Sequence, residues 1–330
     1  MSDQWKLTSS FGERQRREGR MLSDVLLDLC AEHGIATSLL LRAAAGFGLR
    51  HHLRTDETLT MSEDPSMVAI AVDAHERLEP VVETVLGIQR HGLVTVERLA
   101  QAPDLPDSAE AKLTVHLGRD ERVGEGPSYV VACELLRQQG VAGASVLVGV
   151  DGTSRGRRQR ARFFGRNRAV PAMVLAVGAS ERVRSALPEL QRLLPDAVVT
   201  LERVRICKRD GQVLAGPSGL AREQQWQRLT VYTSEHHLVG GEPVHRAIVR
   251  RLRAGETRGV TVLRGAWGFH GEHAPHGERL WQLGRRVPVV TTVVDTPDRI
   301  ARAFGVVDEL TVGHGLVTTE LVPRAVSQAW

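Results

Sequence analysis

The sequence contains little cysteine and no long hydrophobic run. Its three cysteines lie far apart and form no Cys-X-X-Cys pair, which excludes a disulfide framework. No apolar run approaches the roughly 18 residues that a membrane helix needs, and the first residues lack the pattern of a signal peptide. Hydrophobic residues make up 42% and charged residues 25%, values that exclude wholesale disorder. We therefore expect a soluble, cytoplasmic protein.

Lysine is also scarce. Only Lys6, Lys112 and Lys208 are lysines among 43 basic residues, and the formal net charge is +4. Arginine suits phosphate ligands because its guanidinium group binds oxyanions through two parallel hydrogen bonds. A coding bias towards arginine would produce the same composition. Both explanations remain open at this stage.

The motifs of common enzyme classes are missing too. The sequence has no Walker A loop, no nucleophile elbow, no His-Glu-X-X-His and no Gly-X-Gly-X-X-Gly after a strand. Cys30 and Cys133 fall on expected helices, where a packed, inert thiol is typical. We therefore predict a protein that is not an enzyme and that requires no cofactor.

What the sequence does contain is an internal repeat, the first feature to search for in a chain of 330 residues. A Lys/Arg-Leu-Thr triplet occurs three times, and a leucine follows the leucine of each triplet by 34 residues. A proline and a Val-Thr-X-Glu segment complete each copy. The landmarks are the triplets 6–8, 112–114 and 228–230; Leu41, Leu147 and Leu263; Pro65, Pro171 and Pro288; and the segments 94–97, 199–202 and 317–320. The chain is thus a tandem triplication.

Each copy shows the same order of periodicities. A short alternating strand (about 6–10, 112–116 or 228–232) precedes a turn, an amphipathic helix and a second strand, and a long polar stretch then leads to a β-branched strand, a second helix and a final strand. This βαββαβ order predicts an α+β fold of three ferredoxin-like domains. We place the domains at 1–101, 111–206 and 227–324, with flexible linkers at 102–110 and 207–226.

Several segments resemble the DUF190 family of PII-like proteins. These are Leu-Arg-[Ala/Gly]-Ala-X-Gly-Phe at 41–47 and 263–269, the histidines His51, His52 and His273, Ser-Glu-Asp-Pro at 62–65, and Gly-Leu-Val-Thr at 92–95 and 315–318. The resemblance covers about 95 residues in each copy. Copy two departs from it, because Val-Gly-Val-Asp-Gly occupies 148–152 and the signature arginine is missing.

The resemblance implies a compact trimer whose sheets face inward and whose three clefts bind small effectors, typically nucleotides. It also implies that the long loop after the second strand, the T-loop, contacts a protein partner. DUF190 genes often lie beside fluoride-channel genes, so a membrane-channel partner is one option. Three fused copies then predict a monomeric, intramolecular pseudo-trimer whose clefts need not be identical.

Candidate ligand-binding residues lie at the end of the second strand. Glycine there lets backbone N–H groups approach an anion, and the two signature arginines are placed to reach a phosphate. Alternatively, the glycines only bend the chain out of the sheet. The candidates are Arg42, Gly46, Phe47, Gly48, Gly149, Gly152, Arg264, Gly265, Gly268 and Phe269.

The three long loops differ in content, and loops of this length are usually functional. The first carries His51 and His52, and the second carries many arginines, so that both are candidates for partner contact. A simple solvated loop is the alternative, and nucleic acid is disfavoured because no base-reading element accompanies the charge. The arginines are Arg155, Arg157, Arg158, Arg160, Arg162, Arg166 and Arg168.

The third loop carries His270, His273 and His276 together with Glu272, which are ligands that zinc or copper accepts. Pro275 disfavours a regular helix there. The sequence thus predicts a sensor that binds a small anionic effector, a nucleotide, and signals through its loops. Metal binding in the manner of CutA-type relatives of the PII fold and a purely structural interaction module are the alternatives.

Overall fold

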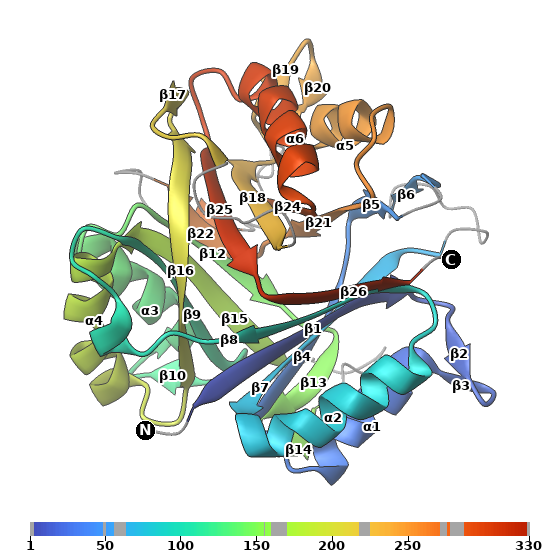
Figure 1. The fold of residues 1–330 in the computed structure, drawn as a ribbon. Helices are drawn as coiled ribbons and strands as arrows, with labels where there is room; N and C mark the ends of the chain where they lie inside the picture. Colours follow the sequence, from blue (N-terminus) through green and yellow to red (C-terminus); the bar gives the residue numbers. More distant parts are fainter. Residues whose placement is uncertain are drawn as a thin grey trace.

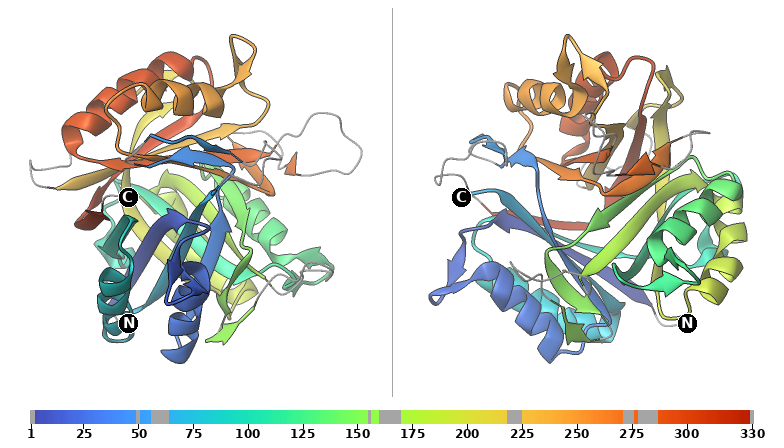
Figure 2. Two further views of the ribbon diagram at one scale, coloured as in Figure 1. Left: turned by 90° about the vertical axis from the view of Figure 1, so that its right-hand side faces the viewer. Right: turned by 180° about the vertical axis from the view of Figure 1, so that it is seen from behind.

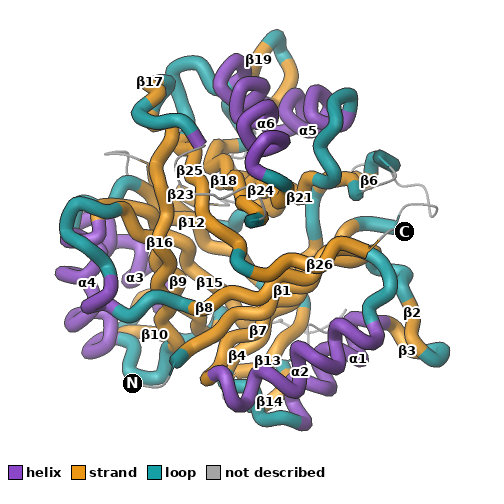
Figure 3. The backbone as a smooth tube through the Cα atoms, in the orientation of Figure 1, coloured by secondary structure: helices purple, strands orange, loops and turns teal. Residues whose placement is uncertain are grey.

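The fold repeats one βαββαβ unit three times, as predicted. The computed structural model describes residues 3–48, 51–55, 64–154, 156–159, 170–217, 225–270, 276–277 and 287–328. Figure 1 shows the helices at three corners of the molecule and the strands at its centre, and Figure 3 shows the same separation of helix and strand along the backbone. From behind, in the right-hand view of Figure 2, the helices again lie outside.

The elements of the three copies correspond one to one. Copy one contains β1 (Gln4–Gly12), α1 (Leu22–Glu32), β4 (Thr37–Arg42), β7 (Ser66–Ala74), α2 (His75–Ile88) and β8 (Gly92–Arg98). Copy two contains β9 (Glu110–Gly118), α3 (Ser128–Gln138), β12 (Gly143–Val148), β15 (Pro171–Ala179), α4 (Ser180–Leu193) and β16 (Val198–Arg209). Copy three contains β18 (Trp226–Ser234), α5 (Val244–Arg253), β21 (Val260–Arg264), β24 (Pro288–Asp295), α6 (Pro297–Leu310) and β25 (Leu316–Val322).

In every copy the second strand lies at one edge, followed by the third, first and fourth strands, all antiparallel. The orders are β4-β7-β1-β8, β12-β15-β9-β16 and β21-β24-β18-β25, which is the ferredoxin-like arrangement. Each helix buries a stripe of apolar residues at helical spacing on the outer face of its sheet, as Leu78, Val81, Val82 and Val85 do in α2. One core forms in each copy between helices and sheet.

A fourth core lies between the inner faces of the three sheets. It contains Leu39 and Leu41 from copy one, Leu147 and Met173 from copy two, and Val290 from copy three, all buried. Alternation along a strand sends neighbouring side chains to opposite faces, so each strand serves the core of its own copy and this shared core. The shared core makes the three copies one folded body.

Short strands that extend from one copy to another join the copies at one edge of each sheet. After its second strand, each copy sends a short strand to the second strand of another copy. β5 (Ala45–Phe47) pairs with β21, β13 (Asp151–Ser154) with β4, and β22 (Trp267–His270) with β12. The three exchanges form a closed cycle.

A second cycle runs through the fourth strands. Ala100 of copy one bridges to Leu201 in β16, Arg205–Arg209 at the end of β16 pairs with β25, and β26 (Arg324–Gln328) returns to β8. In Figure 1, β26 crosses from the red third copy to the blue first copy. Both cycles close within one chain, which confirms the intramolecular pseudo-trimer.

The segments expected as flexible linkers contain ordered structure. β16 continues to Arg209, past the predicted domain end, and pairs back with β17 (Gln212–Val213). Cys207 and Lys208 are buried there, and Lys208 Nζ donates a hydrogen bond of 2.7 Å to the Asp308 carbonyl oxygen. The first linker contains a short 3-10 turn (Ala102–Asp104) and the buried Leu105. Composition indicated flexibility, but strand pairing with copy three orders the start of the second segment, and β17 pairs back on β16.

Short hairpins precede the first helix of each copy, where the sequence indicated only a turn. They are β2 (Arg16–Arg17) with β3 (Arg20–Met21), β10 (Arg122–Val123) with β11 (Gly126–Pro127), and β19 (Leu238–Val239) with β20 (Glu242–Pro243). Among the described helices, none is long and apolar enough to cross a membrane.

Candidate functional site

The glycines predicted to bind an anion serve the exchange of strands. A Cβ on Gly46, Gly152 or Gly268 would overlap the carbonyl oxygen of Val260, Ser38 or Ala144 on the strand that each one joins. The backbone N–H groups of Gly149 and Gly265 donate to the carbonyl oxygens of Pro171 (2.9 Å) and Pro288 (2.7 Å). These N–H groups therefore do not face a ligand, and close approach of two backbones explains the glycines.

The two phenylalanines of the signature are anchors between copies. Phe47 of copy one is buried in the core of copy three, and Phe269 of copy three is buried in the core of copy two. Thr153 takes the equivalent place in copy two and is fully buried. Its hydroxyl hydrogen-bonds Ser38 Oγ at 2.9 Å. Phe47 and Phe269 thus pack between copies. The residue type at this position depends on the copy that it packs against: phenylalanine against copies three and two, and threonine against copy one.

The two signature arginines form ion pairs within their own copies. Arg42 lies 3.2 Å from Glu13, and Arg264 lies 3.0 Å from Glu235. In copy two both partners are different, since Val148 replaces the arginine and Arg119 the glutamate. The arginine and the glutamate are therefore both present in copies one and three and both absent from copy two.

Arg264 nevertheless lines a large basic cleft, which we call the cationic cleft. It has a volume of about 710 Å³ and lies between the segment after β4 of copy one and helix α5 of copy three. Among the described residues, four arginines line it against one carboxylate, that of Glu242. The lining residues are Ala44, Ala45, His51, His52, Leu53, Glu242, His245, Arg246, Val249, Arg250, Arg253, Ala254 and Arg264.

Helix α5 supplies most of this charge. Its apolar stripe, which includes Ile248 and Leu252, faces the core of copy three, so the intervening arginines must face outward. Arg250 contacts Glu242 at 2.9 Å. Arg253 Nε donates to the His51 carbonyl oxygen, and His51 Nδ1 lies 2.8 Å from the Arg253 carbonyl oxygen. The base of the first long loop is thus tied to the helix that lines the cleft.

His245 is the buried polar group of the cationic cleft. Only 3% of its surface is exposed, and its Nδ1 makes no hydrogen bond to any described residue. Burial and the nearby charges of Arg264 and Arg246 lower its pKa to about 4. At neutral pH the imidazole is uncharged, and an anion in the cleft would favour its protonation.

The cleft between copies one and two has the opposite arrangement, and we call it the self-filled cleft. Arg158 of the second long loop lies 2.7 Å from Asp24 and 2.5 Å from Asp28 of α1, and 2.6 Å from Asp151. Burial alone would lower the pKa of Arg158, but the bonds to these three carboxylates raise it above its usual value. The charge of Arg158 is neutralised inside the chain, and contact of this side chain with a partner stays a prediction.

The structure describes only some of the other residues predicted in the second and third long loops. Arg157 is exposed on β14 (Arg157–Arg158), whereas Arg155, Arg160, Arg162, Arg166 and Arg168 lie outside the described residues. His270 ends β22 and His276 begins β23 (His276–Gly277), and these two strands pair antiparallel. His273 and Glu272 lie outside the described residues. Metal binding by this loop stays a prediction.

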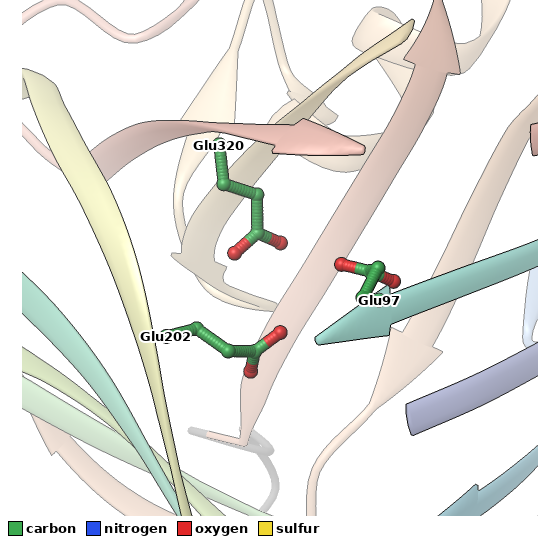
Figure 4. Close-up of side chains that lie close together, drawn as sticks. All are labelled: Glu97, Glu202 and Glu320. Carbon is green, nitrogen blue, oxygen red and sulfur yellow. The ribbon is translucent and has the colours of Figure 1, made fainter. Parts of the chain in front are cut away.

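A third polar site lies on the pseudo-threefold axis and was not predicted. The last residues of the three Val-Thr-X-Glu segments, Glu97, Glu202 and Glu320, point toward one another (Figure 4). The first residue of each Lys/Arg-Leu-Thr triplet contacts them. They alternate in a closed ring of six charges, which we call the axial ring. Its members, in order, are Lys6, Glu97, Arg228, Glu320, Lys112 and Glu202.

Every neighbouring pair in the axial ring is in contact. Arg228 lies 2.6 Å from Glu97 and 2.7 Å from Glu320, while Lys112 lies 2.6 Å from Glu320 and 3.2 Å from Glu202. Lys6 contacts Glu202 and lies 3.5 Å from Glu97. All six residues are buried. Three positive and three negative charges thus compensate one another away from water.

Glu97 and Glu320 stay ionised despite this burial. Burial raises the pKa of Glu320, but Lys112 and Arg228 outweigh it and lower that pKa to about 2. Arg228 and Lys6 likewise hold the pKa of Glu97 well below its usual value against the effect of burial. The three glutamates are close enough together to suggest a metal site. The three cations between them already occupy their oxygens, so we assign the ring to structure.

The residues of the axial ring belong to the landmarks that identify the repeat in the sequence. A lysine or arginine at the start of each triplet and a glutamate at the end of each closing strand recur in all three copies. We used them to set the register, and nothing local indicated that they meet. Two of the three lysines in the chain belong to the axial ring.

These observations define a single-chain pseudo-trimer of ferredoxin-like domains. The model of the DUF190 family (Uncharacterized ACR, COG1993) matches residues 4–101, 110–206 and 226–324. The chain therefore belongs to the DUF190 family. The expected resemblance is confirmed in all three copies, including the divergent second one.

Comparison with known proteins gives distant relatives. The UPF0166 protein of Aquifex aeolicus (strain VF5) is 29% identical over 93 residues, which is 28% of this chain and 86% of that protein. Among solved structures, the regulatory subunit of aspartate kinase from Thermus thermophilus is 15% identical, with 58% of this chain and 93% of that chain covered and a TM-score of 0.26. An unknown protein from Galdieria sulphuraria is 12% identical, with 62% and 99% covered and a TM-score of 0.20. TM-scores this low carry no argument about function.

Proposed function

We propose that the protein is a non-enzymatic sensor that binds a small phosphate-bearing effector, such as a nucleotide, in the cationic cleft. The observation that carries the proposal is the lining of this cleft, where four arginines and the buried His245 face one volume. Arginine and protonated histidine bind phosphate oxygens through charge-assisted hydrogen bonds. The contact between Arg253 and His51 offers a route from the cleft to the first long loop, where a protein partner would read occupancy.

The buried thiols argue against covalent catalysis by cysteine, which fits a protein that only binds its effector. Cys30 and Cys133 are buried, and burial raises the pKa of each to about 12. A thiol with so high a pKa offers little thiolate, which is the nucleophilic form. The cysteines thus serve packing in copies one and two.

Calorimetric titration of adenine nucleotides and cyclic dinucleotides into the full chain tests the proposal. We expect saturable binding that weakens at least tenfold in Arg250→Gln, because removal of one charge-assisted contact costs about 1.5–3 kcal/mol. Arg122→Gln is the matched control, since it removes the same charge from the exposed hairpin of copy two. Equal loss in both variants, or no saturable binding at millimolar ligand, would contradict the proposal.

A further inference from the structure

The shared core borders a partly open cavity on the axis, next to the axial ring. Its volume is about 190 Å³, and residues of all three copies line it. Protein interiors are close-packed and contain few voids larger than a water molecule. A cavity of this size at the meeting point of three domains therefore calls for a specific explanation.

The strand periodicity explains where the cavity lies. Inward-facing positions along a strand are two residues apart. One inward position of β1, β9 and β18 belongs to the axial ring, and the next, two residues on, holds a threonine in all three copies, namely Thr8, Thr114 and Thr230. Beside the paired charges of the axial ring, the wall of the cavity thus carries the hydroxyl groups of the three threonines.

The third inward position breaks the symmetry. It holds Ser10 in copy one, His116 in copy two and Tyr232 in copy three, and all three line the cavity. A symmetric trimer would repeat one side chain three times at this level. The fused chain combines a small, a medium and a large side chain, so the space left by Ser10 faces an imidazole and a phenol ring.

His116 is the polar group that the cavity leaves without a protein partner. It is 6% exposed, and its Nε2 makes no hydrogen bond to the described residues. Burial, together with Lys6, lowers the pKa of His116 to about 4, so the ring is neutral at physiological pH. Thr200 Oγ1 also lines the cavity and likewise has no partner among the described residues.

Much of the remaining wall is apolar, although Ser66, Thr95, Thr261 and Thr292 also line it. Ile70, Met173, Leu175, Leu263 and Val290 line the cavity and belong to the shared core or pack against it. Half-buried Trp226 and Arg258 line its outer part, where the guanidinium of Arg258 lies 5.3 Å from the centre of the Trp226 ring. The cavity therefore approaches the surface beside copy three.

We propose that this axial cavity is a binding site for a small, uncharged and mostly apolar organic molecule that carries one hydrogen-bonding group. The size fits, because cavities of about 150 Å³ lined by apolar side chains accept benzene. The cations that line the cavity are already paired. Lys6, Lys112 and Arg228 contact the glutamates of the axial ring, and Arg258 lies 3.7 Å from Asp295, so none of these charges needs a ligand of opposite sign. His116 Nε2 and Thr200 Oγ1 supply the partners for the single polar group of the ligand.

This site is distinct from the cationic cleft in chemistry and in position. The two are adjacent at β5, where Ala45 lines the cleft and Phe47 lines the cavity. A molecule in the cavity therefore contacts all three copies and the exchanged strand that carries a wall of the cleft. The proposal does not depend on the binding of an anionic effector.

Calorimetry and thermal shift with phenol and indole test the site in the full chain. We expect saturable binding of one molecule per chain, and binding at least tenfold weaker for the charged analogues benzoate and benzylamine. Ile70→Phe adds volume inside the cavity and is expected to weaken phenol binding at least tenfold. Leu238→Phe makes a similar exchange on an exposed turn and is expected to leave binding unchanged.

Crystals of the unaltered protein soaked with 4-bromophenol provide a test that does not depend on the folding of a variant. An anomalous bromine peak in the cavity would support the site, whereas a peak elsewhere or none would overturn the proposal. Binding that is equal for phenol and benzoate, or that is the same in Ile70→Phe and the unaltered chain, would overturn it as well. Loss of nucleotide binding in Arg250→Gln tests only the cationic cleft, so the two proposals fail separately.

Discussion

The cationic cleft and the self-filled cleft occupy equivalent places in the pseudo-trimer but carry opposite charge. Helix α1 presents Asp24 and Asp28 in the self-filled cleft, and the corresponding positions of α5 are Arg246 and Arg250. The second loop brings the cation Arg158 to the acidic helix. The first loop brings His51 and His52 to the basic helix. One cleft is thus occupied by its own guanidinium group, and the other is suited to an external anion.

This difference shows what fusion of three copies permits. Three identical chains must place the same residues at every interface. In one chain each cleft can change separately, and the anchors change with it: Phe47 beside the cationic cleft, Thr153 with Ser38 beside the self-filled one. We therefore expect the clefts to respond differently to equivalent substitutions.

The largest expected effect is that of Phe47→Ala, which removes the anchor beside the cationic cleft. A buried phenylalanine truncated to alanine costs about 3–5 kcal/mol of unfolding free energy. The equivalent change Thr153→Ala removes a hydrogen-bonded pair, for which we expect about 1 kcal/mol. Guanidinium chloride unfolding of both variants measures the difference. Equal losses would show that the two junctions are energetically alike despite their chemistry.

Arg158→Ala is expected to have the next largest effect, because it leaves three carboxylates without their shared cation. Asp151 is 95% buried and the guanidinium group is largely covered, so we expect a loss of about 2–3 kcal/mol. Arg157→Ala on the same short strand is the matched control, with a change below about 0.5 kcal/mol since this side chain is exposed. Chemical unfolding at neutral pH measures both. A loss in Arg158→Ala no larger than in the control would contradict a self-filled cleft.

The smallest expected effect is a pH dependence of anion binding in the cationic cleft. The pKa of His245 is about 4, and a bound anion raises it, so binding takes up a proton and the affinity increases as the pH falls. Sulfate is a suitable probe because its charge does not change between pH 7.5 and 5.5. We expect several-fold tighter binding at the lower pH, up to about tenfold for each unit by which the pKa rises.

His245→Gln should remove this dependence, and His52→Gln should retain most of it, because His52 is exposed at the edge of the cleft. Calorimetry at the two pH values provides the comparison. A dependence that persists in His245→Gln would assign the proton to His51, His52 or Glu242, which also line the cleft.

Much of the fold could be predicted from the repeated pattern, and less of the site. The landmarks set the three copies in register, and the periodicities identified the strands and helices. Arg264, His51 and His52 were selected from the sequence and do line the cationic cleft. Gly46, Gly152 and Gly268 were predicted to approach an anion, but their close neighbours are backbone atoms of another copy. Arg246, Arg250 and His245 were missed, since they appear in sequence as parts of an ordinary amphipathic helix.

The repeated βαββαβ unit follows from the amino-acid sequence alone, because hydrophobic periodicity and turn residues act over a few positions. Which charges meet depends on how the three copies pack. Lys112 and Glu320 are separated by 208 positions, and Arg158 and Asp24 by 134. Electrostatic contacts form over a few ångströms in space, whatever the distance along the chain. The strands exchanged between copies bring these residues together. They thereby form the cationic cleft, the self-filled cleft and the axial ring, which differ in charge.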